Sequence, residues 1–123
     1  MKILVCGDRH WKDFLTIYTV LKEYEHTAEA VIHGAATGAD TLAGDAAEAL
    51  HIPVRSYPAE WDKGPAAGPI RNRRMLQIEH PDMILAFHND LENSKGTKDM
   101  VGRAKQAGIP VHHYTTDGGP FIL

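Results

Sequence analysis

Cysteine is nearly absent from this 123-residue chain, which contains only Cys6. A single cysteine cannot form an internal disulfide, so the sequence favours a reducing, cytoplasmic setting. Long apolar runs are also lacking, and none approaches the roughly 20 residues that span a bilayer. The first residues do not contain the longer apolar region of a secretory signal peptide. We therefore expect a cytoplasmic protein with no membrane partner.

An excess of positive charge is lacking as well. Lys and Arg number 13 against 16 Asp and Glu, which gives a formal net charge of −3 at pH 7. General binding to nucleic acid depends on surplus cations, so the composition argues against it. The eight histidines include no pair at helical i, i+4 spacing with a nearby carboxylate, the pattern that metal sites use. We predict neither a bound metal ion nor a cofactor.

Five short apolar runs alternate with four segments of helical periodicity. The runs span residues 3–6, 30–33, 53–57, 83–87 and 109–114, and the helical segments span residues 13–24, 40–50, 69–79 and 96–107. This alternation predicts an α/β fold, with a parallel sheet and helices on both of its faces. The length predicts one domain over residues 1–123, with a loosely held tail after residue 114.

Polar, glycine-bearing segments follow four of the predicted strands. They comprise residues 7–9, 33–40, 61–74 and 89–97. Ligands of open parallel sheets bind beyond the carboxyl ends of the strands, at the point where the strand order reverses. Because all four segments leave carboxyl ends, we expect them to converge on one edge of the sheet and to form the functional site there.

The segment 33–40 (HGAATGAD) joins a strand to a helix and holds two glycines. Small side chains let a ligand approach the main chain, and the helix that follows directs free N–H groups and its positive dipole end at the loop. This arrangement suits a phosphate or carboxylate. A tight turn with close helix–sheet packing explains the same residues, and the sequence leaves both interpretations open.

Arg71, Arg73 and Arg74 lie at the start of a predicted helix, where positive charges oppose the helix dipole. An anion bound by guanidinium groups would offset this placement, whereas pairing with surface carboxylates is the alternative. Residues 94–97 (SKGT) resemble the end of a phosphate loop without being a Walker A motif. They suit either an anion at a helix N-terminus or an ordinary helix cap.

These segments together resemble one family. The chain is similar to the YspA-like clade of the SLOG superfamily, which consists of small phage and bacterial proteins. The residues that carry this similarity are 5–9, 33–40, 58–61, 67–72 and 95–97, the pairs 75–76, 81–82 and 86–87, and Met100. The resemblance extends over residues 2–111. It implies a Rossmann-like three-layer domain with a five-stranded parallel sheet of order 3-2-1-4-5, which binds nucleotide-derived ligands. It also implies a homo-oligomer, because superfamily members often dimerise.

The sequence departs from the family pattern at several positions. Asp8 replaces the usual Gly or Ser, Thr37 replaces the usual Arg, and the loop before Gly96 is not glycine-rich. Related phosphoribohydrolases carry a glutamate three residues after the threonine of their Gly-Thr pair, where this chain has Met100. Methionine is no general base, so we expect negligible base release and a partial gain of hydrolysis on Met100→Glu. Asp99, Asp40 and Glu60 are the substitute catalytic candidates.

The resemblance leads to one functional hypothesis and two alternatives. The first is a protein that binds a phosphorylated nucleotide or an ADP-ribose-like molecule, as a sensor or sequestering protein for a signal in phage–host conflict. The alternatives are an N-glycosidase acting on nucleoside phosphates, and a single-strand DNA binder like the DprA relatives. We expect ligand contacts from Gly7, Asp8, Arg9, His33, Gly34, Ala35, Gly38, Ala39, Asp40, Trp61, Arg71, Asn72, Ser94, Lys95, Gly96 and Thr97.

Overall fold

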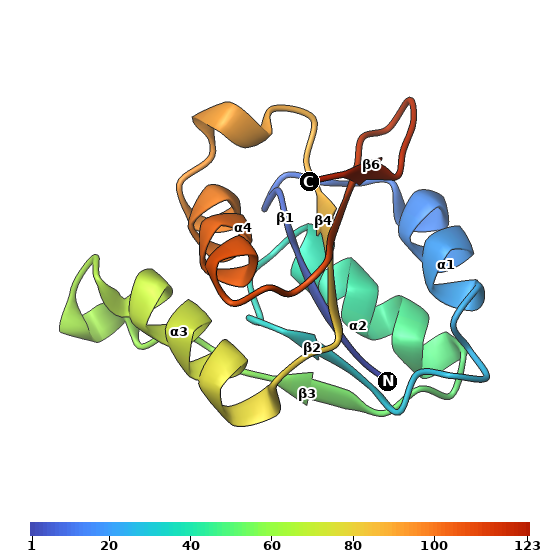
Figure 1. The fold of residues 1–123 in the computed structure, drawn as a ribbon, viewed down its shortest axis with the longest axis horizontal. Coiled ribbons are helices and arrows are strands. Elements are labelled where there is room, and N and C mark those ends of the chain that lie inside the picture. Colours follow the sequence, from blue (N-terminus) through green and yellow to red (C-terminus); the bar gives the residue numbers. More distant parts are fainter.

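A six-stranded sheet forms the middle layer of the computed structural model, which describes residues 1–123 (Figure 1). The strand order is β3-β2-β1-β4-β5-β6. The strands are β1 (Lys2–Gly7), β2 (Ala30–His33), β3 (Val54–Ser56), β4 (Met83–Phe87), β5 (Val111–Tyr114) and β6 (Phe121–Ile122). The first five strands pair in parallel, and β6 pairs with β5 in the antiparallel direction.

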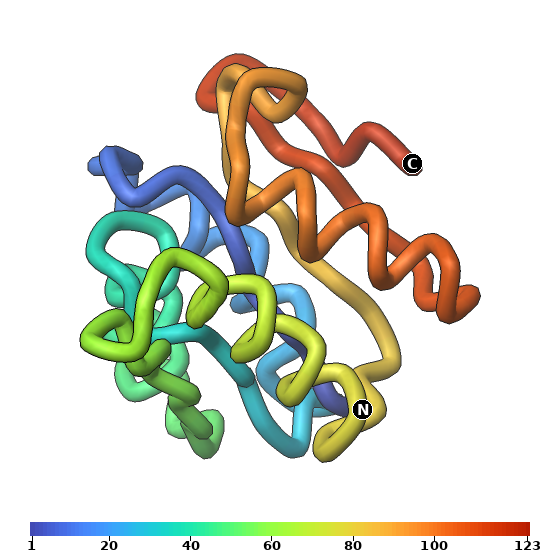
Figure 2. The backbone as a smooth tube through the Cα atoms, turned by 90° about the vertical axis from the view of Figure 1, so that its left-hand side faces the viewer, coloured from blue at the N-terminus to red at the C-terminus, as the bar shows by residue number.

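Two pairs of helices cover the two faces of the sheet. The helices α1 (Phe14–Lys22) and α2 (Ala39–Ala49) lie on one face, and α3 (Ala67–Glu79) and α4 (Gly96–Gln106) lie on the other, in front of the strands in Figure 2. Two short 3-10 helices, η1 (Trp61–Lys63) and η2 (Leu91–Asn93), precede α3 and α4. The four α-helices lack the length and apolar content that a membrane-spanning helix requires.

The central strands are apolar on both sides because helices cover both faces. In β1 the side chains alternate: Ile3 and Val5 belong to the core under α1 and α2, whereas Leu4 and Cys6 belong to the core under α3 and α4. The parallel register places Leu4 opposite Ile84 of β4, so the same alternation continues across the sheet. These two cores hold the carboxyl ends of the strands at a common edge.

The parallel order 3-2-1-4-5 agrees with the expectation, but the count of five strands is wrong. The tail, expected to be loosely held, adds β6 as a sixth strand. A turn reverses the chain, with Thr115 N donating to Gly118 O at 2.9 Å, and Leu123 N donates to Val111 O at 3.1 Å. A strand of two residues is too short to show the alternation by which strands are identified from sequence.

Candidate functional site

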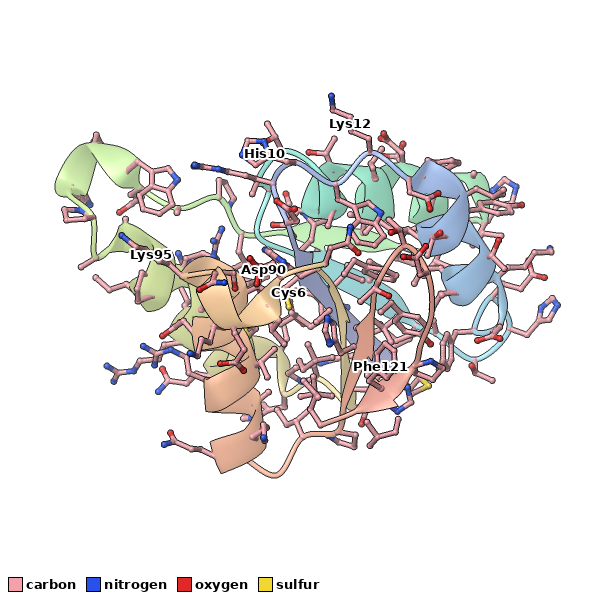
Figure 3. All side chains as sticks on the ribbon, turned by 90° about the horizontal axis from the view of Figure 1, so that it is seen from above. Cys6, His10, Lys12, Asp90, Lys95 and Phe121 are labelled. Atoms are coloured by element: carbon pink, nitrogen blue, oxygen red, sulfur yellow. The ribbon has the colours of Figure 1, made fainter.

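The loops that follow β1, β2, β3 and β4 meet at the carboxyl edge of the sheet, as the order of elements predicts. Figure 3 looks down on this edge and shows Cys6 at the end of β1, His10 and Lys12 in the loop after it, and Asp90 and Lys95 before α4. The parallel strands β1 and β4 are neighbours whose following helices lie on opposite faces, so this is the point where the strand order reverses.

Two side chains of the segment 33–40 accept hydrogen bonds from backbone amides of the same segment. Asp40 Oδ2 accepts hydrogen bonds from the amides of Gly34 (3.1 Å) and Ala36 (3.2 Å). His33 Nδ1 accepts the amide of Ala35 at 2.9 Å, and its Nε2 faces Gly44 of α2, where a Cβ would lie 2.9 Å away. Burial lowers the pKa of His33, and the nearby Arg71 charge lowers it further. His33 and Asp40 therefore organise the loop and do not point outward from it.

Two glycines at this edge serve close packing between loops. A Cβ on Gly38, whose φ is +75°, would overlap the backbone of Asp8 and Arg9, and a Cβ on Gly7 would overlap Phe87 O. The amide of Ala39 donates to Asp8 O at 3.0 Å across the same contact. The tight-turn interpretation of the segment 33–40 thus holds at Gly38, and Gly7 of β1 packs closely in the same way. Arg9 and Asp8 keep side chains at the rim, where Asp8 Oδ1 accepts the amide of His10 at 2.8 Å.

Ala35 occupies the left-handed region of the backbone, with φ of +59°. An L-residue there costs about 1–2 kcal/mol, and Ala35 is exposed, so few contacts offset that cost. We expect Ala35→Gly to raise the free energy of unfolding by about 1 kcal/mol, because the larger unfolded-state entropy of glycine cancels part of the gain. Urea unfolding measures this change. Ala36→Gly, at a residue without positive φ, is the control and should destabilise the protein instead.

Arg71 extends across the edge beneath the segment 33–40. Its Nη1 donates to Gly34 O and to Tyr57 O (3.3 Å), and its Nε donates to Asn72 Oδ1 at 3.0 Å. A Cβ on Gly34 would overlap the guanidinium, so Gly34 makes this position possible. The guanidinium is half-buried, and that burial lowers the pKa of Arg71, while the charge of Asp40 opposes the change.

The alternative interpretation, in which the arginines of α3 pair with surface carboxylates, is not met. None of the ion pairs within 4.0 Å includes Arg71, Arg73 or Arg74. Arg74 lies over the ring of Tyr57, with its guanidinium carbon 5.9 Å from the ring centre. The charge of Asp40 offsets part of the desolvation cost of Arg71, but no carboxylate contacts the guanidinium directly. Arg71 is therefore a candidate anion-binding group at this edge.

Asn72 connects Arg71 to the start of α4. Its Nδ2 donates to Gly96 O (3.2 Å) and to Asp99 Oδ2 (3.0 Å). The first intrahelical bond of α4 is from Asp99 N to Lys95 O, and Ser94 Oγ accepts Lys98 N at 3.0 Å. Ser94 thus acts as a helix cap, and the preceding amides, those of Gly96 and Thr97, remain available for an anion.

A hollow of about 80 Å³, here called the β3–α3 hollow, lies between the loop after β3 and α3. Its wall consists of Tyr57, Pro58, Ala59, Glu60, Lys63, Ala67, Ile70, Arg71 and Arg74. The sequence-based site missed Lys63, which lies in the segment 61–74, and Tyr57, which is the last residue of the third predicted strand. Trp61 lies outside the hollow. Its ring packs against Gly68, so closely that a Cβ added to Gly68 would be 2.7 Å from the ring, and 61 % of the residue is exposed.

The three carboxylates proposed as catalytic candidates already have partners. Asp99 Oδ2 accepts Arg103 Nε at 2.9 Å in addition to Asn72, and Asp40 accepts the two loop amides. Glu60 pairs with Lys63 at 2.8 Å, and this contact lowers the pKa of Glu60. Met100, where the related hydrolases have glutamate, is 1 % exposed and packs in the core under α3 and α4.

Burial raises the pKa of Asp40 from 3.8 to about 6, although the loop amides and Arg71 oppose the increase. Because the carboxyl of Asp40 binds its proton more tightly in the folded protein, protonation stabilises the fold. This stabilisation is complete at a pH below the pKa of Asp40 in the unfolded chain, and it is lost as the pH rises through the pKa of Asp40 in the folded protein. We therefore expect Asp40 to make the protein more stable at pH 4 than at pH 7, by about 2–3 kcal/mol. Urea unfolding at both pH values, compared with Asp40→Asn, isolates this contribution. A variant with the wild-type pH dependence would contradict it.

Known proteins are similar to this chain in sequence. The model of the YspA, cpYpsA-related SLOG family matches residues 1–64. The chain is also similar to the Gene 61 protein of Mycobacterium phage D29, with 34 % identity over 122 residues, which cover 92 % of this chain and 95 % of that protein. The match includes β1, β2 and the segment 33–40, which build half of the carboxyl edge. The chain therefore belongs to the YspA, cpYpsA-related SLOG family.

Proposed function

We propose that this protein binds a phosphorylated nucleotide or an ADP-ribose-like ligand at the carboxyl edge of the sheet, without turning it over. The observation that carries the proposal is Arg71, a half-buried guanidinium that has no carboxylate within 4.0 Å. A ligand phosphate would supply the missing direct ionic contact through charge-assisted hydrogen bonds. Membership of the SLOG family supports a nucleotide-related role in general.

The start of α4 supplies the other half of the proposed phosphate site. The amides of Gly96 and Thr97 precede the first intrahelical bond, and the dipole of α4 favours negative charge there. Asn72 holds this helix start beside Arg71. The phosphate would therefore lie between a guanidinium and a helix N-terminus, above the switch point of the sheet.

Binding without turnover is favoured over N-glycosidase activity. A glycosidase has to stabilise a cationic ribosyl transition state and to activate a water molecule, and both tasks need a free carboxylate. Asp40, Asp99 and Glu60 are each engaged by other groups, and Met100 is buried. A role as sensor or sequestering protein for a nucleotide-derived signal fits such a site, and the phage relative is consistent with a setting of phage–host conflict.

Calorimetric titration with AMP, NAD and ADP-ribose, followed by chromatography of the incubated mixtures, tests this function. We expect saturable binding of at least one of these and no accumulation of free base. Multiple turnovers that Asp99→Asn abolishes would replace the binding function by the N-glycosidase. Binding of single-stranded DNA that weakens steeply with salt would support the DprA-like alternative instead.

Exposed apolar side chains on and near α3 support a homo-oligomer. Trp61, Ile70 and Ile78 are 61 %, 63 % and 53 % exposed. We expect light scattering at micromolar concentration to give a multiple of the 13.6 kDa chain mass. Ile78→Glu should shift the mass towards the monomer, because it places a charge within an apolar contact. A monomeric wild-type protein would contradict this prediction.

A further inference from the structure

The β3–α3 hollow lies beside the proposed phosphate position but outside it. On the helix, the residues that form its wall are Ala67, Ile70, Arg71 and Arg74. They fall at i, i+3, i+4 and i+7, so they occupy one face of α3, the face turned towards the loop after β3. A volume of about 80 Å³ admits several water molecules, each of which needs at least about 10–15 Å³, and it therefore admits a phosphate group.

Positive charge predominates around this hollow. Lys63, Arg71 and Arg74 line it together with one carboxylate, Glu60, which leaves an excess of two positive charges. Lys63 Nζ lies 2.8 Å from Glu60, so these two groups neutralise each other. The two arginines have no carboxylate within 4.0 Å, and the ring of Tyr57 holds the guanidinium of Arg74 at the wall. The hollow is thus a small concave surface with two unpaired guanidinium groups.

Arg71 belongs both to the hollow and to the phosphate position at the start of α4. Its side chain forms part of the wall, and its Nε donates to Asn72 Oδ1 at 3.0 Å. Asn72 Nδ2 in turn donates to Gly96 O at 3.2 Å. One side-chain amide therefore separates the hollow from the helix start. This separation suits two anionic groups of a single small molecule.

We propose that the β3–α3 hollow is a second anion subsite, which binds another phosphate of the ligand whose first phosphate lies at the start of α4. This inference rests on the proposed function and narrows the ligand class to nucleotides with two phosphate groups. A nucleoside monophosphate fills one subsite only. A nucleotide with a second phosphate fills both and gains the contacts of Lys63 and Arg74.

Calorimetric titration of the whole chain with AMP, ADP and adenosine 3′,5′-bisphosphate tests the subsite. We expect the tighter-binding of the two ligands with two phosphates to bind about tenfold more tightly than AMP. A tenfold gain is what one charged hydrogen bond of moderate strength contributes. The double variant Lys63→Ala, Arg74→Ala should lose that tenfold gain and keep the wild-type affinity for AMP. The gain should also decrease in 0.5 M salt, because exposed charges are screened.

Two further variants give matched controls. Arg73→Ala removes an exposed arginine of α3 that does not line the hollow, and it should leave all three affinities unchanged. Glu60→Gln removes the carboxylate that occupies Lys63, so it should strengthen binding of the bisphosphorylated ligand severalfold without affecting AMP. Equal wild-type affinities for the three nucleotides, or an equal loss of all three in the double variant, would overturn the subsite.

Failure of the subsite and failure of the proposed function give different results. If no nucleotide binds, the proposed function fails, and inorganic pyrophosphate then tests the hollow alone. Shifts of the amide resonances of Lys63 and Ala67 in the wild type, absent from the double variant, would retain the hollow as an anion site. Unchanged resonances would overturn it together with the nucleotide site.

Discussion

Replacing Arg71 by alanine should weaken binding of AMP by roughly 10- to 150-fold. The guanidinium makes charge-assisted contacts to the ligand phosphate in our proposal, and such contacts contribute about 1.5–3 kcal/mol. The fold should persist, because Arg71 forms no ion pair and belongs to neither of the two apolar cores. Calorimetry measures the affinity, and thermal unfolding verifies the fold.

Gly34→Ala provides an independent test of the same arrangement. It leaves the charge of Arg71 in place, but its Cβ would overlap the guanidinium and displace it. The loss of AMP affinity should therefore approach that of Arg71→Ala, whereas Arg73→Ala, at an exposed position, should bind as the wild type does. Unchanged affinity in Arg71→Ala would remove this residue from the site and with it the main support for the proposed function.

Replacing Met100 by glutamate should destabilise the protein by about 3–5 kcal/mol, the cost of an unpaired buried charge. Met100 is 1 % exposed and packs with Leu4 and Ile84 under α3 and α4. Its side chain packs in this core, so a carboxylate at position 100 would be buried, and the expected partial gain of hydrolysis requires that it reach the open edge. Urea unfolding measures the loss of stability.

Met100→Leu is the matched control, because it keeps the apolar character and nearly the same volume. We expect it to change the free energy of unfolding by less than about 1.5 kcal/mol. A Met100→Glu protein as stable as the wild type would mean that position 100 reaches water. In that case a carboxylate there would be available for base release, and assays with AMP would be warranted.

The strand order 3-2-1-4-5 rested on the family resemblance, whereas the succession of helices and strands and their parallel sheet could be predicted from the residues directly. Local patterns carry this information: continuous apolar runs for strands buried on both faces, and helical periodicity between them. The convergence of the loops at one edge followed from the parallel order, because every strand of such a sheet ends at the same side. The prediction included Gly34, Asp40, Arg71, Asn72 and Gly96, which the structure brings together.

Only the tertiary structure decided what each of these residues contacts. Arg71 and Gly34 are 37 positions apart in the chain, and no local pattern specifies that the guanidinium of Arg71 lies against the backbone of Gly34. Helical periodicity alone did not establish that Met100 faces the core, since the neighbouring Asp99 lies only about 100° further round the helix. The sequence by itself determined the family, the layers and the edge at which the candidate site lies. Contacts between distant segments decided the rest, because packing and charge burial depend on neighbours that the order of residues does not reveal.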